Sequence, residues 1–478
     1  MKSNLRTRPR WLAPAGLALA LAAGSTPVGG MESGAGLTLP AVQRATLPNG
    51  LTVIVMPTHR LPLVDFRLVA RAGSVNDPAG KEGLASLTAE LLTQGAGKRD
   101  ARAVAGDIAF VGGTLDASVA AEQLVVTAEV LKKHFATGLE LFHDVIVAPT
   151  FPPAEFARKK AETLGEIASE RDDPETVASN ELGPFLLGSS PLAHPVVGWE
   201  KSVKTLTRAD VVIFHHQRVV PANAMLAVVG DVEPDEVIAA LKKAFADWKP
   251  GPLPPGTKPA SAATVAYGPP APVHGRRVLI VSKPEVTQTQ IRLATLGVPR
   301  NSPDYYAIVV ANTILGGGFT SRLVNEIRVV QGLTYSISSR WPMYRNAGTY
   351  EISTFTRNET LRKTIDATLA EVQKLVDAGP AQAELDKAKR YLTGQFPLGL
   401  QAPDALASQL LNIEFYGLDP RYLEAYAGRV NAVTMADVRR VLKEHFGVAD
   451  LRILVVSNPE TAKSALAGLG PVAVQPLR

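Results

Sequence analysis

The chain has 478 residues, 46% of them hydrophobic and 20% charged, which is enough for two or more globular domains of about 100–200 residues each. It contains no cysteine, which excludes disulfides, thiol catalysis and thiolate metal sites. Of the formal net charge of +5, four positive charges lie in residues 1–23, which carry no acidic residue, so the rest of the chain carries 5 − 4 = +1. A charge this small predicts neither nucleic-acid binding nor attraction to an anionic membrane.

The N-terminus has the order of a secretory signal peptide. Four basic residues precede an apolar run from Trp11 to Ala23, and the run ends in small residues. A run of about 13 residues is too short for a bilayer, which needs about 20. We therefore expect a signal peptide over residues 1–24, a loose segment over residues 25–43, a periplasmic or otherwise exported protein, and no membrane span after cleavage.

Strand-like and helix-like stretches are mixed along residues 44–250, which we predict to be an N-terminal domain. β-branched runs indicate strands, and apolar residues three and four apart indicate helices. We predict strands over Leu51–Met56, Val64–Ala72 and Ala224–Val229, a hairpin over Thr114–Ala128, and helices over Gly83–Gly95, Leu131–Val147, Pro153–Glu170 and Glu233–Trp248.

Residues 251–277 are rich in proline and small residues, which predicts a linker. After it the order restarts, and we predict a C-terminal domain over residues 278–470 followed by a tail over residues 471–478. The matching elements are strands over Val278–Val281 and Gln290–Leu296 and a helix over Asp304–Leu315.

Short identities support this repeat. Thr207–Val211 recurs as Thr434–Val438, an offset of 434 − 207 = 227, and the strand at Val228 recurs at Val455 with the same offset. Gly113-Thr114 recurs as Gly348-Thr349 with a different spacing. A period this long indicates duplicated domains. The expected fold class is α+β, with two homologous α/β-sandwich halves in one chain.

A glycine-rich segment opens the second half's most distinctive region. Leu315–Arg322 lacks the Gly-Lys-Ser/Thr of a phosphate loop, so its glycines are expected to end one helix and turn the chain into the next. Leu323, Ile327 and Val330 then predict a helix that ends at Gly332, and Leu333–Ile337 alternates as a strand does.

Several stretches together resemble the pitrilysin/insulinase family of inverted-motif zinc peptidases. They are Leu47-Pro-Asn-Gly-Leu51, Ala72-Gly-Ser74, Gly83-Leu-Ala85, Gly165-Glu-Ile167, Asp172-Asp-Pro174, His194-Pro195, Val229-Gly-Asp231, Ser321-Arg-Leu323 and Gly332-Leu-Thr-Tyr335. The resemblance covers nearly all of residues 44–470, and it implies that the two halves share the fold of that family.

The resemblance places the family's zinc site on residues that cannot form it. The H-x-x-E-H motif falls on Ser86, Ala89 and Glu90, and the third ligand falls on Glu166, which is 166 − 90 = 76 residues later. A hydroxyl is a weak zinc ligand, and alanine cannot act as a general base. We expect no catalytic residue and no metal or cofactor in this chain. Two carboxylates, Glu90 and Glu166, could hold a hard cation, but a solvated helix face explains Glu90 equally well.

The second half keeps Arg328 and Tyr335, which stand where the family has its arginine–tyrosine signature. A guanidinium and a phenol can hydrogen-bond to peptide carbonyls or to a terminal carboxylate. The alternative is that Tyr335 packs with Leu333 and Ile337 while Arg328 is solvated.

Some bacterial members of the family resemble two-subunit assemblies, and this chain is similar to the subunit without the metal motif. The resemblance implies a non-catalytic, peptide-positioning subunit whose partner is a homologous, zinc-bearing peptidase subunit and whose substrates are peptides. The hairpin over Gly113–Val126 is a candidate edge for an added peptide strand. Two alternatives are a structural subunit without substrate contact, and a stand-alone hydrolase with a rebuilt site at Glu90, Glu166 and a histidine.

Overall fold

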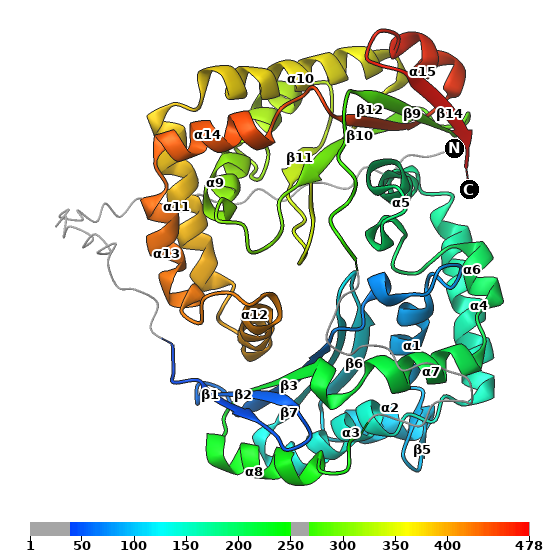
Figure 1. The fold of residues 1–478 in the computed structure, drawn as a ribbon, viewed down its shortest axis with the longest axis vertical. Coiled ribbons are helices and arrows are strands. Elements are labelled where there is room, and N and C mark those ends of the chain that lie inside the picture. The colour runs from blue at the N-terminus through cyan, green and yellow to red at the C-terminus, as the bar shows by residue number, and fades with distance from the viewer. Residues whose placement is uncertain (1–38, 250–266, 478) are drawn as a thin grey trace, which may run out of the picture. The chain divides into compact units, whose positions relative to one another are not determined.

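The computed structural model describes residues 39–249 and 267–477 (Figure 1). The predicted signal peptide, most of the predicted N-terminal segment and most of the predicted linker lie outside the described residues. No helix of the described residues is long and apolar enough to cross a membrane.

The first half is built on a six-stranded sheet with the order β1-β2-β8-β3-β7-β6. Its strands are β1 (Gln43–Thr46), β2 (Thr52–Pro57), β3 (Leu63–Ala70), β6 (Thr114–Val119), β7 (Leu124–Leu131) and β8 (Ala224–Gly230). Strands β2 and β8 are parallel, and the other neighbours are antiparallel. A two-stranded ribbon of β4 (Gly95–Ala96) and β5 (Arg99–Asp100) stands apart from this sheet.

Side chains on one face of this sheet pack against helices of the same half. Val55, Phe66 and Val126 alternate with residues of the opposite face and are fully buried together with Leu87 of α1 and Phe142 of α3. The helices of this half are α1 (Leu84–Leu92), α2 (Ala101–Phe110), α3 (Phe135–Val147), α4 (Pro153–Glu170), α5 (Pro174–Leu187), α6 (Glu200–Thr205), α7 (Arg208–Arg218) and α8 (Pro234–Ala244).

The second half repeats the arrangement with the strand order β11-β12-β10-β13-β9-β14. Its strands are β9 (Arg277–Ser282), β10 (Gln288–Gly297), β11 (Ile337–Arg340), β12 (Gly348–Arg357), β13 (Arg452–Ser457) and β14 (Val472–Pro476). Its helices are α9 (Tyr305–Leu315), α10 (Leu361–Ala378), α11 (Gln382–Leu398), α12 (Pro403–Tyr416), α13 (Tyr422–Ala432), α14 (Met435–His445) and α15 (Pro459–Ala465), with a π-helix over Val324–Val330.

The two strand orders show the duplication directly. Strands β2, β8, β3, β7 and β6 occupy the places of β9, β13, β10, β12 and β11. The repeated Thr-x-Ala-Asp-Val sequence also has one structural role in both halves. Thr207 and Asp210 form a capping box at the start of α7, and Thr434 and Asp437 form the same box at the start of α14. The predicted two-fold repeat and the α+β fold class are confirmed.

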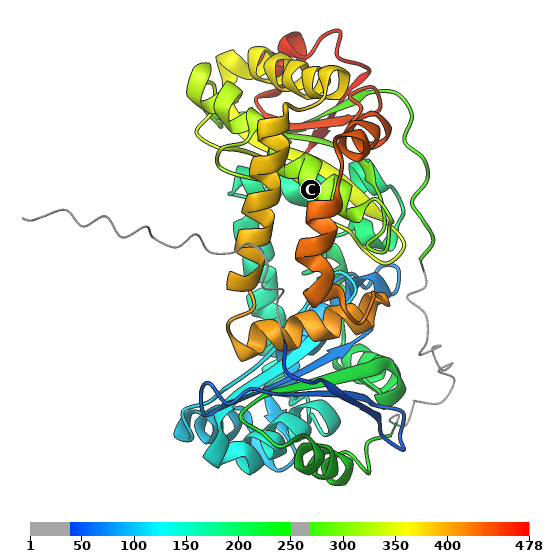
Figure 2. The ribbon, with the colours of Figure 1, turned by 90° about the vertical axis from the view of Figure 1, so that its left-hand side faces the viewer.

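Each half contributes one helix to the sheet of the other. Helix α12, from the second half, packs on β8 and β3, where Leu406 and Leu410 share a core with Met225 and Val229. Figures 1 and 2 show α12 lying across that face of the first sheet. Helix α5, from the first half, packs on β10 and β13 of the second sheet. Both faces of both sheets are therefore covered, and the halves share their cores.

Several boundaries differ from the prediction. The predicted helix over Leu131–Val147 begins only at Phe135, because Leu131 still pairs with Leu63 in the sheet and a 3₁₀ turn intervenes. The helix predicted over Glu233–Trp248 ends at Ala244. The side-chain amide of Asn49 donates to the carbonyl of Phe245 (2.8 Å) just after that end.

Other expectations were wrong. Gly348 begins β12, the counterpart of β7, whereas Gly113 precedes β6, so these two glycines are not equivalent. Residues 471–478, expected to be a tail, include strand β14 at the edge of the second sheet. Leu333–Ile337 is not a strand, because β11 begins only at Ile337. The amide of Ser336 instead donates a hydrogen bond to the hydroxyl oxygen of Thr334 (3.1 Å). This local hydrogen bond competes with strand pairing.

Candidate functional site

Helix α1 carries three of the four positions onto which the resemblance places the zinc site, and hydrogen bonds fix its start. The carboxylate of Asp77 accepts hydrogen bonds from the amides of Gly83 (2.7 Å) and Ala85 (2.8 Å), which otherwise have no partner at a helix N-terminus. Gly83 has φ +98°, and a Cβ there would lie 2.4 Å from the carbonyl oxygen of Val197. Burial raises the pKa of Asp77 to about 7, against the lowering effect of the two amides.

Helix α4 packs against α1 and brings Glu166 toward the motif positions. Between the two helices lies a residue that the sequence analysis did not single out. The Nζ atom of Lys159 is 3.8 Å from Oε2 of Glu90 and 3.2 Å from Oε2 of Glu162. Lys159, Glu162 and Glu166 follow one another on α4 at helical spacing, so they share a face. A lysine ammonium group therefore stands among the carboxylates of this site.

The electrostatics of Glu90 reflect these neighbours. Its side chain is 31% exposed. Burial raises the pKa of Glu90, the positive charge of Lys159 lowers it, and the negative charges of Glu166 and Glu162 raise it again. The structure thus brings Glu90 and Glu166 within electrostatic range of each other.

The residues of this site do not fit a catalytic zinc ion. Zinc of this kind needs three ligands, typically imidazole nitrogens with a carboxylate, and an open position for water. Ser86 offers a neutral hydroxyl, Ala89 is a buried methyl group, and Lys159 adds a positive charge that repels a cation. No step of peptide hydrolysis can be assigned to these side chains.

A rebuilt metal site is not found elsewhere in the described chain. Within residues 39–249 and 267–477, only Asp304, Glu444 and His445 form a group of three candidate ligands. The carboxylate of Asp304 in this group is already paired, because the guanidinium of Arg440 donates to both of its oxygens (2.6 and 3.1 Å). His215 is buried and bonds through Nε2 to the carbonyl of Ile146 (2.8 Å).

Strand β6, at the edge of the first sheet, lies beside α1. It is the first strand of the predicted hairpin, which is confirmed. Its main chain pairs with β7 on one side. In the described parts of the chain, no group outside β7 hydrogen-bonds to the main chain of Thr114 to Val119. This edge can therefore accept another extended strand.

The corresponding edge in the second half is partly closed. Strand β11 pairs with β12, and the main-chain groups of Ser339 are already used. The amide of Ser339 donates to the carbonyl of Gly316 (3.1 Å), and its carbonyl accepts from the side chain of Asn312 (3.1 Å). A Cβ at residue 316 would lie 2.5 Å from Oγ of Ser339, so this close approach requires glycine. The two edges therefore differ in their capacity for strand addition.

Arg328 lies on the π-helix Val324–Val330, between two aromatic rings. Its Cζ is 5.0 Å from the ring centroid of Phe319 and 4.7 Å from that of Tyr335. Both rings are exposed, Phe319 by 75% and Tyr335 by 74%. Among the described residues, no hydrogen bond or ion pair involves the guanidinium of Arg328. The rings hold the cation by cation–π attraction and leave its N–H donors available.

This geometry bears on two earlier expectations. The guanidinium of Arg328 lies over the ring of Tyr335, and this ring is exposed whereas Leu333 and Ile337 are buried. Val330, expected on the buried stripe of a helix, is 65% exposed. A π-helix is wider than an α-helix, so the 3.6-residue period used for the prediction does not apply.

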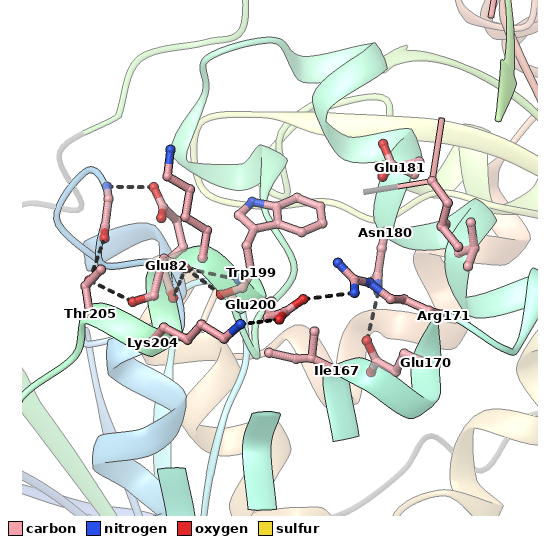
Figure 3. Close-up of a pocket in the computed structure, with 16 residues that line it drawn as sticks. Glu82, Ile167, Glu170, Arg171, Asn180, Glu181, Trp199, Glu200, Lys204 and Thr205 are labelled. Carbon is pink, nitrogen blue, oxygen red and sulfur yellow. Dashed lines mark hydrogen bonds and ion pairs between the residues drawn. The ribbon is translucent and has the colours of Figure 1, made fainter. Parts of the chain in front are cut away.

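A cavity of about 740 Å³ opens beyond the C-terminal end of α4 (Figure 3). Its apolar lining includes Ile167, next to Glu166, and Leu477 from the end of the chain. Three of its charged groups form a chain of ion pairs. Glu200 lies between Lys204 (2.5 Å) and Arg171 (2.9 Å), as Figure 3 shows. The sequence carried no signal for this cavity, because its lining comes from four separate segments.

Sequence comparisons give a consistent assignment. Residues 53–198 match the profile of the insulinase family (peptidase family M16), and residues 205–392 match that of the peptidase M16 inactive domain. An uncharacterized zinc protease of Mycobacterium leprae is 30% identical over 420 residues, which cover 86% of this chain and 91% of that protein. The non-peptidase homolog YmxG of Helicobacter pylori is 24% identical over 91% of this chain and 97% of its own length.

Solved structures agree. The crystal structure of a peptidase M16 inactive domain from Pseudomonas fluorescens has a TM-score of 0.80 and 30% identity, covering 87% of this chain and 98% of that one. A protease from Helicobacter pylori also has a TM-score of 0.80, at 21% identity, and supports the fold alone.

Proposed function

Since the chain belongs to the insulinase family of peptidases (family M16), we propose that it is a non-catalytic subunit that binds peptides and positions them for a homologous, zinc-bearing subunit. The observation that carries this proposal is the ion pair at the former metal site. Lys159 faces Glu90 where the family's fold would hold zinc. The hydrolytic centre therefore belongs to another chain, and this chain contributes binding.

Two features support a peptide as the bound molecule. The open edge of β6 offers main-chain donors and acceptors, which bind an extended peptide without strict choice of sequence. Arg328 offers N–H donors held between two rings. A guanidinium of this kind binds carbonyl oxygens or a terminal carboxylate. We assign Arg328 and Tyr335 to substrate binding on these grounds.

The N-terminal sequence supports export to the periplasm. The order of basic, apolar and small residues in residues 1–24 is that of a signal peptide. The absence of cysteine is compatible with an oxidising compartment. We propose that the subunit and its zinc-bearing homologue meet there.

Reconstitution tests the proposal. The purified chain, a homologous subunit with an intact H-x-x-E-H motif from the same organism, and an equimolar mixture are each assayed with a fluorogenic peptide, alongside metal analysis. We expect no stoichiometric zinc and no cleavage from this chain alone, and faster cleavage from the mixture than from the homologue alone. Chelator-sensitive cleavage by this chain alone would contradict the proposal. Complex formation without any gain in peptide affinity or turnover would favour a structural subunit.

A further inference from the structure

A second cavity, of about 500 Å³, lies directly beside the aromatic pair that holds Arg328. It is formed by the end of α9, the segment 318–320 and helix α11. Buried Ile314 and Ala388 line it, together with the exposed rings of Phe319 and Tyr391. Its size falls within the range of about 300–1,000 Å³ that ligand pockets occupy.

Phe319 joins this cavity to Arg328. The same exposed ring that lies 5.0 Å from Cζ of Arg328 also lines the cavity. A peptide whose main chain is bound by Arg328 would therefore place a neighbouring side chain within reach of the cavity. The cavity and the binding position at Arg328 are therefore connected by one residue of the glycine-rich segment, Phe319.

The charge around the cavity is positive. Its charged lining residues are Glu384, Lys387 and Arg390. Glu384 is neutralised by a bidentate pair with Arg322 (2.7 Å at both oxygens). Lys387 donates to a main-chain carbonyl, and among the described residues no carboxylate pairs with Lys387 or Arg390. An acidic group beside the cavity would therefore gain attraction without displacing an existing partner.

We propose that this cavity is a side-chain subsite for peptides that carry an aromatic or large aliphatic residue next to an acidic one. The inference rests on the proposed peptide-binding function and adds a substrate preference to it. The apolar side chain lies between the rings of Phe319 and Tyr391, where aromatic contacts favour it. The acidic residue lies near Lys387 and Arg390.

Binding of fluorescent peptides to the full chain alone, measured by anisotropy, tests this subsite without any partner. The probes are short alanine-based peptides with a central Phe or Ala, each with or without an adjacent Asp. We expect the Phe peptide to bind about tenfold more tightly than the Ala peptide. An adjacent Asp should strengthen binding further at low salt, and this gain should fall at high salt.

Substitutions in the lining of the cavity test whether the preferences for Phe and Asp arise there. Tyr391→Ala removes one wall and should reduce the preference for Phe to about twofold or less. The double variant Lys387→Gln/Arg390→Gln should remove the gain from Asp and keep the preference for Phe. Phe110→Ala is the matched aromatic control, because Phe110 is 91% exposed in the first half. Lys242→Gln/Lys243→Gln, on the exposed face of α8, is the matched charge control.

Three outcomes overturn the inference in different ways. If the Phe and Ala peptides bind the unaltered chain equally, the subsite is wrong while the proposed peptide-binding function stands. If no peptide binds the chain alone or in the reconstituted pair, the proposed function fails and the subsite fails with it. If the Phe110 control abolishes the preference as Tyr391→Ala does, the effect does not come from this cavity.

Discussion

The ammonium group of Lys159 lies 3.8 Å from the carboxylate of Glu90, at the position where two helices of this fold would otherwise bring a metal ion and its ligand together. The positive charge of Lys159 thus balances the carboxylates of Glu90 and Glu162. The site is therefore not simply vacant of ligands. At this site, the carboxylate of Glu90 on α1 and the ammonium group of Lys159 on α4 form an ion pair.

The position of Lys159 predicts how tightly the chain binds zinc once the H-x-x-E-H motif residues are introduced. The triple variant Ser86→His/Ala89→Glu/Glu90→His restores the motif residues but keeps Lys159 beside them. We expect the same triple variant with Lys159→Ala to bind zinc about tenfold or more tightly, because a cation near the ion is removed. Zinc titration of both proteins measures this. Adding Lys98→Ala, an exposed lysine, to the triple variant is the control, and equal zinc affinity with and without Lys159 would contradict the prediction.

The two rings around Arg328 predict different effects of two changes at Tyr335. Tyr335→Phe keeps the ring, whereas Tyr335→Ala removes one side of the cation–π arrangement, worth about 0.5–1 kcal/mol at an exposed site. We expect Tyr335→Ala to lower kcat/KM of the reconstituted pair by about two- to fivefold and Tyr335→Phe to lower it less. If the phenol hydroxyl itself binds substrate, the two variants will be equally impaired.

Arg328→Ala should have the largest effect in this region. It removes a charged donor that has no hydrogen-bond or ion-pair partner among the described residues, and hydrogen bonds to charged groups contribute about 1.5–3 kcal/mol. We expect a fall of about tenfold or more in kcat/KM of the reconstituted pair, with unchanged thermal stability of the subunit. Arg102→Ala, an exposed arginine on α2, is the control and should change neither quantity.

Glu122, at the turn between β6 and β7, predicts a stability effect. Its buried carboxylate accepts hydrogen bonds from the hydroxyls of Tyr267 (2.5 Å) and Tyr416 (3.1 Å) and from the amide of Arg345 (3.1 Å), all from beyond the first half. Glu122→Ala leaves these donors without an acceptor, and we expect a loss of about 3 kcal/mol or more in the free energy of unfolding. Urea denaturation measures it.

The controls for this prediction are graded. Tyr416→Phe removes a single hydrogen bond to the same carboxylate and should cost about 1 kcal/mol. Glu236→Ala, at an exposed position of α8, should cost less still. A loss for Glu122→Ala no larger than that for Glu236→Ala would show that the network contributes little.

His215 predicts a pH dependence. Burial lowers the pKa of His215 from 6.5 to about 4. A histidine that is neutral when folded contributes stability that is fully present above its unfolded pKa of 6.5 and is lost as pH falls through 4, in total about 3 kcal/mol. The protein should therefore unfold more easily between pH 6.5 and 4 on this account. His215→Gln, which can still donate to the Ile146 carbonyl, should lack this component.

Comparing the unaltered protein with the His215→Gln variant removes the contribution of two aspartates, whose effect on stability changes with pH in the opposite direction. Burial raises the pKa of Asp65 and of Asp77 to about 7, so these groups contribute stability that is present below pH 4 and is lost as pH rises through 7. Both residues are unchanged in the His215→Gln variant, so their effect cancels in the difference between the two stability curves. A difference that does not change between pH 6.5 and 4 would refute the role of His215.

The sequence predicted the elements whose signals are local. The helix predicted over Pro153–Glu170 has the bounds of α4, because its signal lies within a single helix. Strand β11 was misplaced because the competing bond between Thr334 and Ser336 is invisible to an alternation rule. The helix predicted around Val324–Val330 is a π-helix, so the 3.6-residue period used to predict its buried face did not apply.

For the candidate site, comparison with a motif singled out positions such as Ser86 and Arg328, but it did not indicate which side chains lie next to them. Lys159 stands seven residues before Glu166, two helical turns on the same face, which was a usable signal. Phe319 had no such signal, because its meeting with Arg328 depends on how the glycine-rich segment folds back.

Because α5 packs on the sheet of the second half and α12 packs on the sheet of the first half, neither half can bury its sheet without the other. A fragment ending before residue 250 would carry α5 without the sheet it covers and would leave the Met225 face of its own sheet in water. Such a fragment is equivalent to one protomer of an obligate dimer, whose folding depends on its missing mate. We therefore expect the chain to unfold as one cooperative unit, so that a substitution that destabilises α1 also destabilises the half that carries Arg328.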